Sequence, residues 1–181
     1  MGYEGVPGLV ETKEAFDETT LVVDSARVVE ASRYLRDELG FTLLLDITAT
    51  DYLGWGEIPV AGYYGTAAGR DLNEPAAQGY ERTPEPKSTR FTLSYHLLRL
   101  ADDSARLRLQ VRLEDGETVA TVVPVWPTAD WHEREAYDLM GIRFEGHPNL
   151  RRILMDDDWE GHPLRKDYPI GGEPVRFSSE E

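Results

Sequence analysis

The sequence predicts an α+β fold in which helices pack on one face of a mixed, mainly antiparallel sheet, followed by an extended C-terminal tail. Central segments of the chain alternate apolar and polar residues, which is typical of strands with one solvent-exposed face. Two other segments have apolar residues at helical spacing, and periodicity disappears near residue 146. The order strand, helix, strand, meander and final helix is typical of helices covering one face of an antiparallel sheet. We therefore expect a globular domain over 1–145 and a tail over 146–181.

The first part of the chain is expected to hold a short helix, a strand and a longer helix. Residues 9–18 place apolar side chains among acids, which suggests the short helix, and the β-branched residues at 20–23 suggest the strand. Asp24 or Ser25 then caps a helix that ends before Gly40. The apolar residues of this helix recur at helical spacing: Val28, Ala31, Leu35 and Leu39.

The middle of the chain is expected to consist of strands separated by one long loop. Residues 41–52 are strand-like, whereas residues 53–88 contain six glycines and four prolines and predict a loop. Aromatic side chains in this loop suggest that it packs on something. Strict alternation then predicts an antiparallel hairpin over 90–100 and 105–113, with a further short strand at 118–123.

A second long helix is predicted at the end of the globular domain. It spans residues 128–140, where Asp130 and Glu133 resemble a capping box, and Gly141 ends it. Beyond it, prolines, aromatic residues and arginines are interspersed without a period. Because Trp, Tyr and Arg dominate interface hot spots, we expect the tail over 146–181 to fold against another chain.

Composition excludes several classes of function. The 181 residues include 34 acids and 19 bases, a net charge of −15, which argues against nucleic acid as a partner because phosphates require clustered Lys and Arg. The same charge opposes direct adsorption to an anionic membrane. The absence of cysteine excludes disulfides, catalytic thiols, thiolate zinc sites and cysteine-ligated iron–sulfur clusters on this chain. No apolar run approaches the roughly 20 residues of a membrane span, and residues 1–10 do not resemble a signal peptide.

Motifs that would bring chemistry are also missing. A helical zinc-protease motif needs a second histidine four residues after His132, and that position is Ala136. The acidic run at 156–158 lacks the glycine and later glutamate of a calcium loop. No glycine-rich phosphate loop, dinucleotide fingerprint or nucleophile elbow is present. We therefore predict no catalytic, cofactor-binding or metal-binding residues on this chain.

The stretch from 126 to 169 nevertheless resembles a known signature, that of the thirty-kilodalton subunit family of respiratory complex I (the C subunit of NADH–quinone oxidoreductase). The family pattern is matched without departure by Glu133-Arg134-Glu135, Asp138, Leu139-Met140, His147, Arg151 and Ile153-Leu154. Residues 158–169, 46–52 and 95–98 are also similar to the family. One departure is the stretch at 53–88, which the family usually makes shorter.

The resemblance implies a cofactor-free structural and assembly subunit of the peripheral arm of a proton-translocating enzyme. That enzyme passes electrons from NADH through FMN and Fe–S clusters, held by other subunits, to quinone. The implied partners are the forty-nine-kilodalton D subunit, the B subunit and other peripheral-arm subunits, and membrane contact would be made only through the complex, on the cytoplasmic side. The isolated chain is expected to be inactive.

The residues expected to organise the junction of the last helix and the tail, or to contact partner subunits, come from the signature and the segment after it. They are Glu133, Arg134, Glu135, Asp138, His147, Arg151, Arg152, Trp159, His162, Arg165, Lys166, Asp167 and Tyr168. Two other interpretations stay open. One is the equivalent subunit of an F420H2–quinone oxidoreductase or a membrane-bound hydrogenase, and the other is a free-standing hydrolase.

Overall fold

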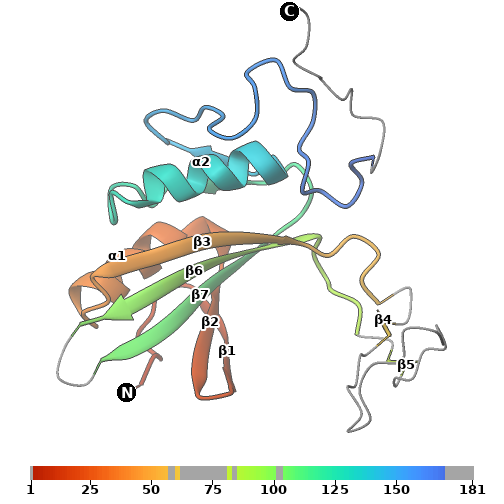
Figure 1. Ribbon diagram of the computed structural model, residues 1–181. Coiled ribbons are helices and arrows are strands. Elements are labelled where there is room, and N and C mark those ends of the chain that lie inside the picture. Colours follow the sequence, from red (N-terminus) through yellow and green to blue (C-terminus); the bar gives the residue numbers. More distant parts are fainter. Residues whose placement is uncertain (1, 57–59, 62–80, 83–84, 101–103, 170–181) are drawn as a thin grey trace, which may run out of the picture.

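The computed structural model describes residues 2–56, 60–61, 81–82, 85–100 and 104–169, and its centre is a five-stranded sheet (Figure 1). The strand order is β1-β2-β7-β6-β3, in which β2 and β7 are parallel and every other neighbouring pair is antiparallel. The strands span Leu9–Ala15 (β1), Glu18–Val23 (β2), Leu43–Asp51 (β3), Phe91–Arg99 (β6) and Ala105–Leu113 (β7). The expected mixed, mainly antiparallel sheet is confirmed.

Both helices cover the same face of this sheet. The inward side chains of β6 and β7 form one buried cluster with side chains of α1 (Val28–Asp37) and α2 (Ala129–Met140). A 3-10 turn, η1 (Ser25–Arg27), precedes α1, and the Asp24 carboxylate accepts a hydrogen bond from the Ala26 N–H at its start. In Figure 1 the sheet lies in front of α1, while α2 lies along β3. No helix of the described residues therefore covers the opposite face of the sheet.

Two short strand pairs complete the described structure. β8 (Thr118–Ala120) pairs in parallel with β9 (Arg143–Glu145), which places the two ends of the α2 connection side by side. β4 (Val60–Ala61) pairs with β5 (Glu81–Arg82) inside the expected long loop at 53–88, most of which lies outside the described residues. Within the described part of the chain no helix combines the length and hydrophobicity of a membrane span.

The prediction of a short helix over residues 9–18 is wrong, because these residues form β1 and the turn into β2. The turn residues Phe16 and Asp17 both have positive φ, 55° and 59°. A two-residue hairpin turn of this kind normally carries Asn and Gly, which tolerate positive φ. Since neither is present, the sequence lacked the usual hairpin signal.

After β9 the chain runs back over α2 without forming further helix or strand. Residues 146–169 follow the side of α2 that faces away from the sheet and then approach the end of β3 (Figure 1). The last residues, 170–181, lie outside the described part. The contacts that hold residues 146–169, which we call the C-terminal segment, make up the candidate site.

Candidate functional site at the root of the C-terminal segment

The four charged signature residues of α2 do not all lie on one side of the helix. Successive helical residues are rotated by about 100°, so Glu133, Arg134 and Glu135 cannot share one site. Glu133 and Asp138 are fully buried, Arg134 is half-buried and Glu135 is exposed. The helix therefore uses its two buried acids on different neighbours. The expected capping box is not formed, because Thr128 occupies the N-cap position and Glu133 turns inward.

Asp138 gathers the backbone of the C-terminal segment. Its Oδ2 accepts hydrogen bonds from the N–H groups of Ile153, Leu154 and Met155 at 2.8, 2.7 and 3.0 Å. Its Oδ1 accepts a hydrogen bond from Arg152 Nη1 at 2.7 Å. Burial by itself would raise the pKa of Asp138, but the three N–H donors and Arg152 outweigh it and lower this pKa. One carboxylate thus binds four consecutive residues.

Arg152 extends this anchor to the following turn. Its side chain is largely buried, and Nη2 donates to the carbonyl oxygens of Trp159 and Gly161 at 3.0 and 2.9 Å. Nη1 also donates to the carbonyl oxygen of Asp138 at 3.1 Å. His162 Nδ1 lies 2.8 Å from the same oxygen. The guanidinium therefore closes residues 152–161 into a loop over the C-terminal end of α2.

Gly141 lets His162 reach this position. It ends α2 in the left-handed conformation, with φ at 77°, and its N–H donates to the Tyr137 carbonyl oxygen. A Cβ atom here would lie 2.7 Å from His162 Cδ2, which is closer than van der Waals contact allows. The glycine is needed both for its conformation and for the approach of the imidazole.

We expect Gly141→Ala to destabilise the chain more than Gly116→Ala does. Both glycines have positive φ, so each substitution costs about 1–2 kcal/mol in backbone strain. A Cβ at Gly116 meets nothing within 4 Å, whereas at Gly141 it meets His162. Urea unfolding should show an additional loss of at least about 1 kcal/mol for Gly141→Ala. Equal losses in the two variants would contradict a tight contact with His162.

Glu133 connects α2 to the residues that directly follow strand β8. Its Oε1 accepts a hydrogen bond from the Val122 N–H at 2.7 Å, and its Oε2 accepts one from the Thr121 hydroxyl at 2.5 Å. The nearest base is His147, whose buried Nε2 lies 3.9 Å from Oε2. Burial raises the pKa of Glu133 to about 7, although the bonds from Thr121 and Val122 act in the opposite direction. This carboxyl group is therefore the buried titratable group of the site that changes charge near neutral pH.

Further titratable groups surround Glu133. His147 Nδ1 accepts a hydrogen bond from the Asn149 N–H, so Nε2 carries the proton of a neutral imidazole. That Nε2 lies 3.3 Å from Asp130 Oδ1. The buried hydroxyl of Tyr95, on β6, has its pKa raised by burial and by the charge of Glu133. No arginine or lysine of the described residues forms an ion pair with Glu133, so its charge is not neutralised by a permanent cation.

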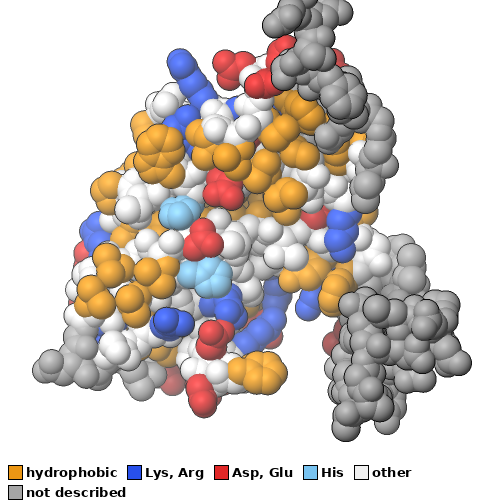
Figure 2. Space-filling model, viewed as in Figure 1, with side chains coloured by type: hydrophobic (Ala, Val, Ile, Leu, Met, Phe, Trp, Pro, Cys, Tyr) orange, Lys and Arg blue, Asp and Glu red, His pale blue; other side chains and the backbone are white. Residues whose placement is uncertain are grey.

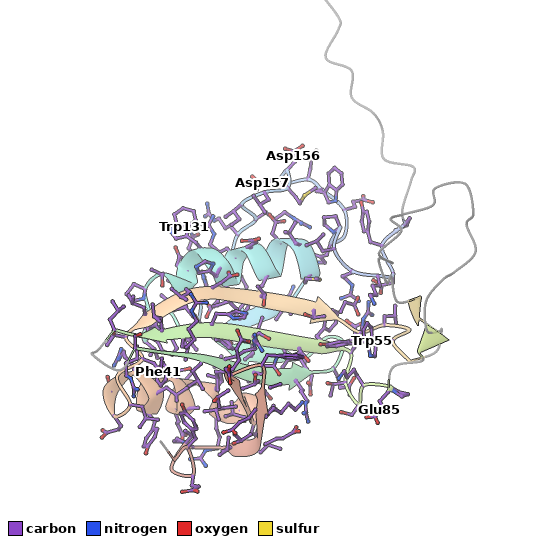
Figure 3. All side chains as sticks on the ribbon, turned by 60° about the horizontal axis from the view of Figure 1, so that its bottom comes forward. Phe41, Trp55, Glu85, Trp131, Asp156 and Asp157 are labelled. Carbon is purple, nitrogen blue, oxygen red and sulfur yellow. The ribbon has the colours of Figure 1, made fainter. Side chains whose placement is uncertain are left out.

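Arg134 supports the segment from the outer side of α2. Its Nε donates to the Arg151 carbonyl oxygen at 3.2 Å, and its guanidinium lies 5.0 Å from the centre of the Trp131 ring. Trp131 is 61% exposed and points away from the sheet, as do Asp156 and Asp157 in the C-terminal segment (Figure 3). Glu135 and the Arg151 side chain are also exposed. These residues form the outer surface of the site and contribute little to its internal anchoring.

A second anchor lies at the end of β3. Asp51 is buried and accepts hydrogen bonds from Arg90 Nη2 at 3.0 Å and from the Lys166 N–H at 2.9 Å. Arg165 binds Asp115 and Asp167 through its guanidinium, at 2.8 and 3.0 Å. Its hydrogen bond lowers the pKa of Asp167 well below the usual range. The network joins β3, β6, the β7–β8 turn and the C-terminal segment.

The structure brings most of the expected residues together around these two anchors. Glu133 and His147 form one group; Arg134, Asp138, Arg151, Arg152, Trp159 and His162 form the next; Arg165, Lys166 and Asp167 meet the body near β3. Tyr168 instead contacts residues of the C-terminal segment itself, with its N–H donating to the Arg165 carbonyl oxygen and its ring close to Gly161. Glu135 is the exception, since it is exposed on α2. Sequence reasoning missed Asp51, Arg90 and Asp115. Asp51 stands in a stretch that resembles the family, but nothing in the sequence links Arg90 or Asp115 to a residue 50 or more positions away.

Chemically, the site is suited to anchoring a chain segment. Its polar atoms are mostly used in hydrogen bonds and ion pairs within the chain. Among the residues that the structure describes, no group of three or more His, Cys, Asp or Glu side chains is arranged to hold a metal ion. The arrangement positions the C-terminal segment and exposes Trp131, Leu154 and Leu164 on its outside.

Known proteins are similar to this chain over the residues that form the site. Residues 21–174 match the family described as "Respiratory-chain NADH dehydrogenase, 30 Kd subunit". The chain is 41% identical over 165 residues to the NADH-quinone oxidoreductase C subunit of Geotalea uraniireducens, covering 91% of this chain and 80% of that protein. It is 39% identical to the protein of the same name from Geobacter sulfurreducens, covering 91% and 82%.

Solved structures show the same fold. A trypsin-resistant fragment of Nqo5 is 27% identical, with a TM-score of 0.58 over 77% of this chain and 89% of that one. A chain of the membrane-bound sulfane sulfur reductase, an archaeal respiratory membrane complex, has a TM-score of 0.63 over 91% and 79%. Its identity is 23%, so this likeness concerns the fold alone.

Proposed function

We propose that this chain, which belongs to the family of the 30 kDa subunit of respiratory-chain NADH dehydrogenase, is a cofactor-free structural subunit of the peripheral arm. The complex of which it is a subunit is NADH–quinone oxidoreductase. The observation that carries this proposal is the family match over residues 21–174, which includes the globular body from residue 21 onward, without β1, and the whole C-terminal segment. FMN and Fe–S clusters would be held by other subunits. The isolated chain would catalyse no reaction.

The geometry supports a scaffolding role for the C-terminal segment. Asp138 and Arg152 hold one end of the segment on α2, and Asp51 and Arg165 hold the other beside β3. A segment fixed at both ends presents its outer side chains in one orientation, which lowers the entropy cost of binding a partner. The proposed partners are the forty-nine-kilodalton D subunit and the B subunit of the complex. The chain would reach the membrane only through the complex, on the cytoplasmic side.

Affinity purification from gently solubilised membranes tests this proposal directly. A tagged copy of the full chain should bring down subunits that carry flavin, Fe–S clusters and an NADH site, identified by mass spectrometry. Recovery of an F420-binding module or a hydrogenase module would keep the scaffold and replace the electron donor. Elution of the chain alone, or turnover of a substrate by the purified monomer, would overturn the proposal.

The double variant Arg165→Ala with Lys166→Ala should reduce assembly while leaving the body folded. Arg165 binds Asp115 and Asp167, all partly exposed, so the change is expected to cost the isolated chain only about 1 kcal/mol. The C-terminal segment would lose the ion pairs of Arg165 near β3 and keep the bond from the backbone N–H of residue 166 to Asp51, so its attachment and the position of its partner contacts would be loosened. Thermal unfolding of the isolated chain and the amount of assembled complex in membranes measure the two effects.

A matched control removes the same charges elsewhere. Arg33 and Lys13 have exposed side chains on α1 and β1, far from both anchors in the sequence. The double variant Lys13→Ala with Arg33→Ala should assemble normally. Normal assembly of the Arg165→Ala, Lys166→Ala variant would contradict the role of this anchor.

A further inference from the structure

The outer face of the sheet is polar except at one corner. In the strand register, Leu43 of β3 lies opposite Leu98 of β6, and Leu98 lies opposite Arg106 of β7. Leu43 and Leu45 are 39% and 47% exposed. Elsewhere on this face the paired side chains of β3, β6 and β7 are Asp, His, Thr, Ser, Gln and Arg. We call Leu43, Leu45, Leu98 and Arg106 the leucine corner; Figure 2 looks onto this face, where hydrophobic side chains gather beside a histidine.

A β-bulge contributes to this corner. The pairing of β3 with β6 shifts between Leu44 and Asp46, so Leu45 is the extra residue of the bulged strand. Leu44 and Ile47 on either side remain buried in the core. The core is thus filled by Leu44 and Ile47. The side chain of Leu45 is not part of the core formed by the described residues.

A hollow of about 110 Å³ lies next to Leu45. Its lining consists of Leu45, Leu97 and Leu107, the basic residues His96, Arg106 and Arg108, Thr19, and the acid Glu18, which is paired with Arg108. This volume is well above the roughly 10–15 Å³ of accessible space that one water molecule needs. It therefore suits a single aliphatic side chain and is too small for a cofactor.

The charge of the corner differs from that of the chain. The chain has a net charge of −15, so most of its surface repels an acidic partner. Arg108 is already bound to Glu18 at 2.6 Å, whereas Arg106 is exposed and has no hydrogen-bond or ion-pair partner among the described residues. Burial and Arg108 lower the pKa of His96, while Asp46 and Glu18 act in the opposite direction. Arg106 is consequently the charge available to an incoming group.

We propose that the leucine corner docks a segment of a neighbouring protein in the assembly, one that carries an aliphatic side chain followed by Asp or Glu. The aliphatic side chain would enter the hollow beside Leu45, and the carboxylate would pair with Arg106. This contact lies on the opposite side of the sheet from the helices and so goes beyond the anchoring function of the C-terminal segment. It rests on the proposed function only in that the neighbour belongs to the same assembly.

Photo-crosslinking in the assembled complex tests the proposal. The full chain carries p-benzoylphenylalanine at position 45, and a control carries it at position 92, on the polar part of the same face. Position 45 should give one cross-linked peptide with an aliphatic residue beside an acid, and position 92 should not. Cross-links to lipid, to a basic segment or to no partner in the intact complex would overturn the docking site.

The two proposals fail in different ways. If the chain co-purifies with other subunits but position 45 forms no protein cross-link, only the leucine corner is refuted. If the cross-link forms in a complex that lacks the NADH-oxidising subunits, the leucine corner stands and the assignment of NADH as the electron donor falls.

Charge reversal of the unpaired arginine supplies a second readout. Arg106→Glu should lower the cross-link yield from position 45 by at least about threefold, because it opposes the expected carboxylate. Arg33→Glu, on α1 behind the sheet, makes the same charge change away from the corner and should leave the yield unchanged. An unaltered yield with Arg106→Glu would contradict an acidic partner.

Discussion

Asp138→Asn is expected to release the C-terminal segment from α2 and to destabilise the chain by about 3–5 kcal/mol. The carboxylate has two oxygens, of which one binds three N–H groups and the other binds Arg152. An amide offers only one oxygen, so its NH₂ group would face either the N–H donors or the guanidinium. Donors would be left unpaired in a buried place, which costs more than the loss of one hydrogen bond.

Two measurements separate local release from global unfolding. Urea unfolding of the purified chain gives the stability loss, and hydrogen exchange of the Ile153, Leu154 and Met155 amides reports the segment itself. Asp157→Asn removes an exposed acid of the same segment and should change neither. Unchanged exchange at these three amides in Asp138→Asn would contradict the anchoring role of Asp138.

Glu133 should make the protein less stable as the pH rises from about 4.5 to about 7. Its pKa is about 7 in the folded chain, against an ordinary value of 4.5, so the folded state binds more protons than the unfolded state in this interval. The free energy of unfolding therefore falls as pH rises and levels off above the folded pKa. A difference of this size corresponds to about 3 kcal/mol at 1.36 kcal/mol per pKa unit.

Glu133→Gln should remove this decline. A glutamine oxygen can still accept from the Val122 N–H, and its NH₂ can donate to the Thr121 hydroxyl, as a protonated carboxyl would. The variant and the wild type should be similar near pH 5, and the variant should be the more stable by up to about 3 kcal/mol near pH 8.

Comparing the free energy of unfolding as a function of pH in wild type and in Glu133→Gln separates the effect of Glu133 from that of other titrating groups. The pKa of His96 is lowered, mainly by burial, and this group contributes equally to wild type and variant. Asp130, His147 and Tyr95 lie around Glu133 and remain in both proteins. Glu135→Gln changes an exposed neighbour on the same helix and should keep the wild-type slope. Identical slopes for Glu133→Gln and wild type would show that Glu133 is ionised throughout.

The predicted helices and hairpin were largely right where periodicity is strong. The helix expected from residue 25 to 39 corresponds to η1 and α1, and the one expected at 128–140 corresponds to α2. The alternating segments at 90–100 and 105–113 are β6 and β7. Each of these elements buries one face, so its apolar residues recur along the sequence at the spacing of a helix or a strand.

The errors arise where a local pattern had two solutions. Residues 9–18 were expected to be helical, and the turn at Phe16 and Asp17 instead makes them a strand. Glu133 was expected near a helix cap, yet it is drawn into the core by Thr121 and Val122, more than ten residues earlier in the chain. The expected tail contacts with partner subunits remain predictions.

The sequence by itself determined the fold class, the family signature and the set of residues around which the site is built. Hydrophobic period, charge and motif spacing are properties of neighbouring residues, and one chain contains them in full. Only the tertiary structure decided that Asp138 binds the backbone at 153–155, that Asp51 binds the Lys166 N–H, and that Glu133 has no permanent cation beside it among the described residues. These outcomes depend on which distant groups meet and on how much water is excluded between them, and neither quantity is encoded in the spacing of residues along the chain.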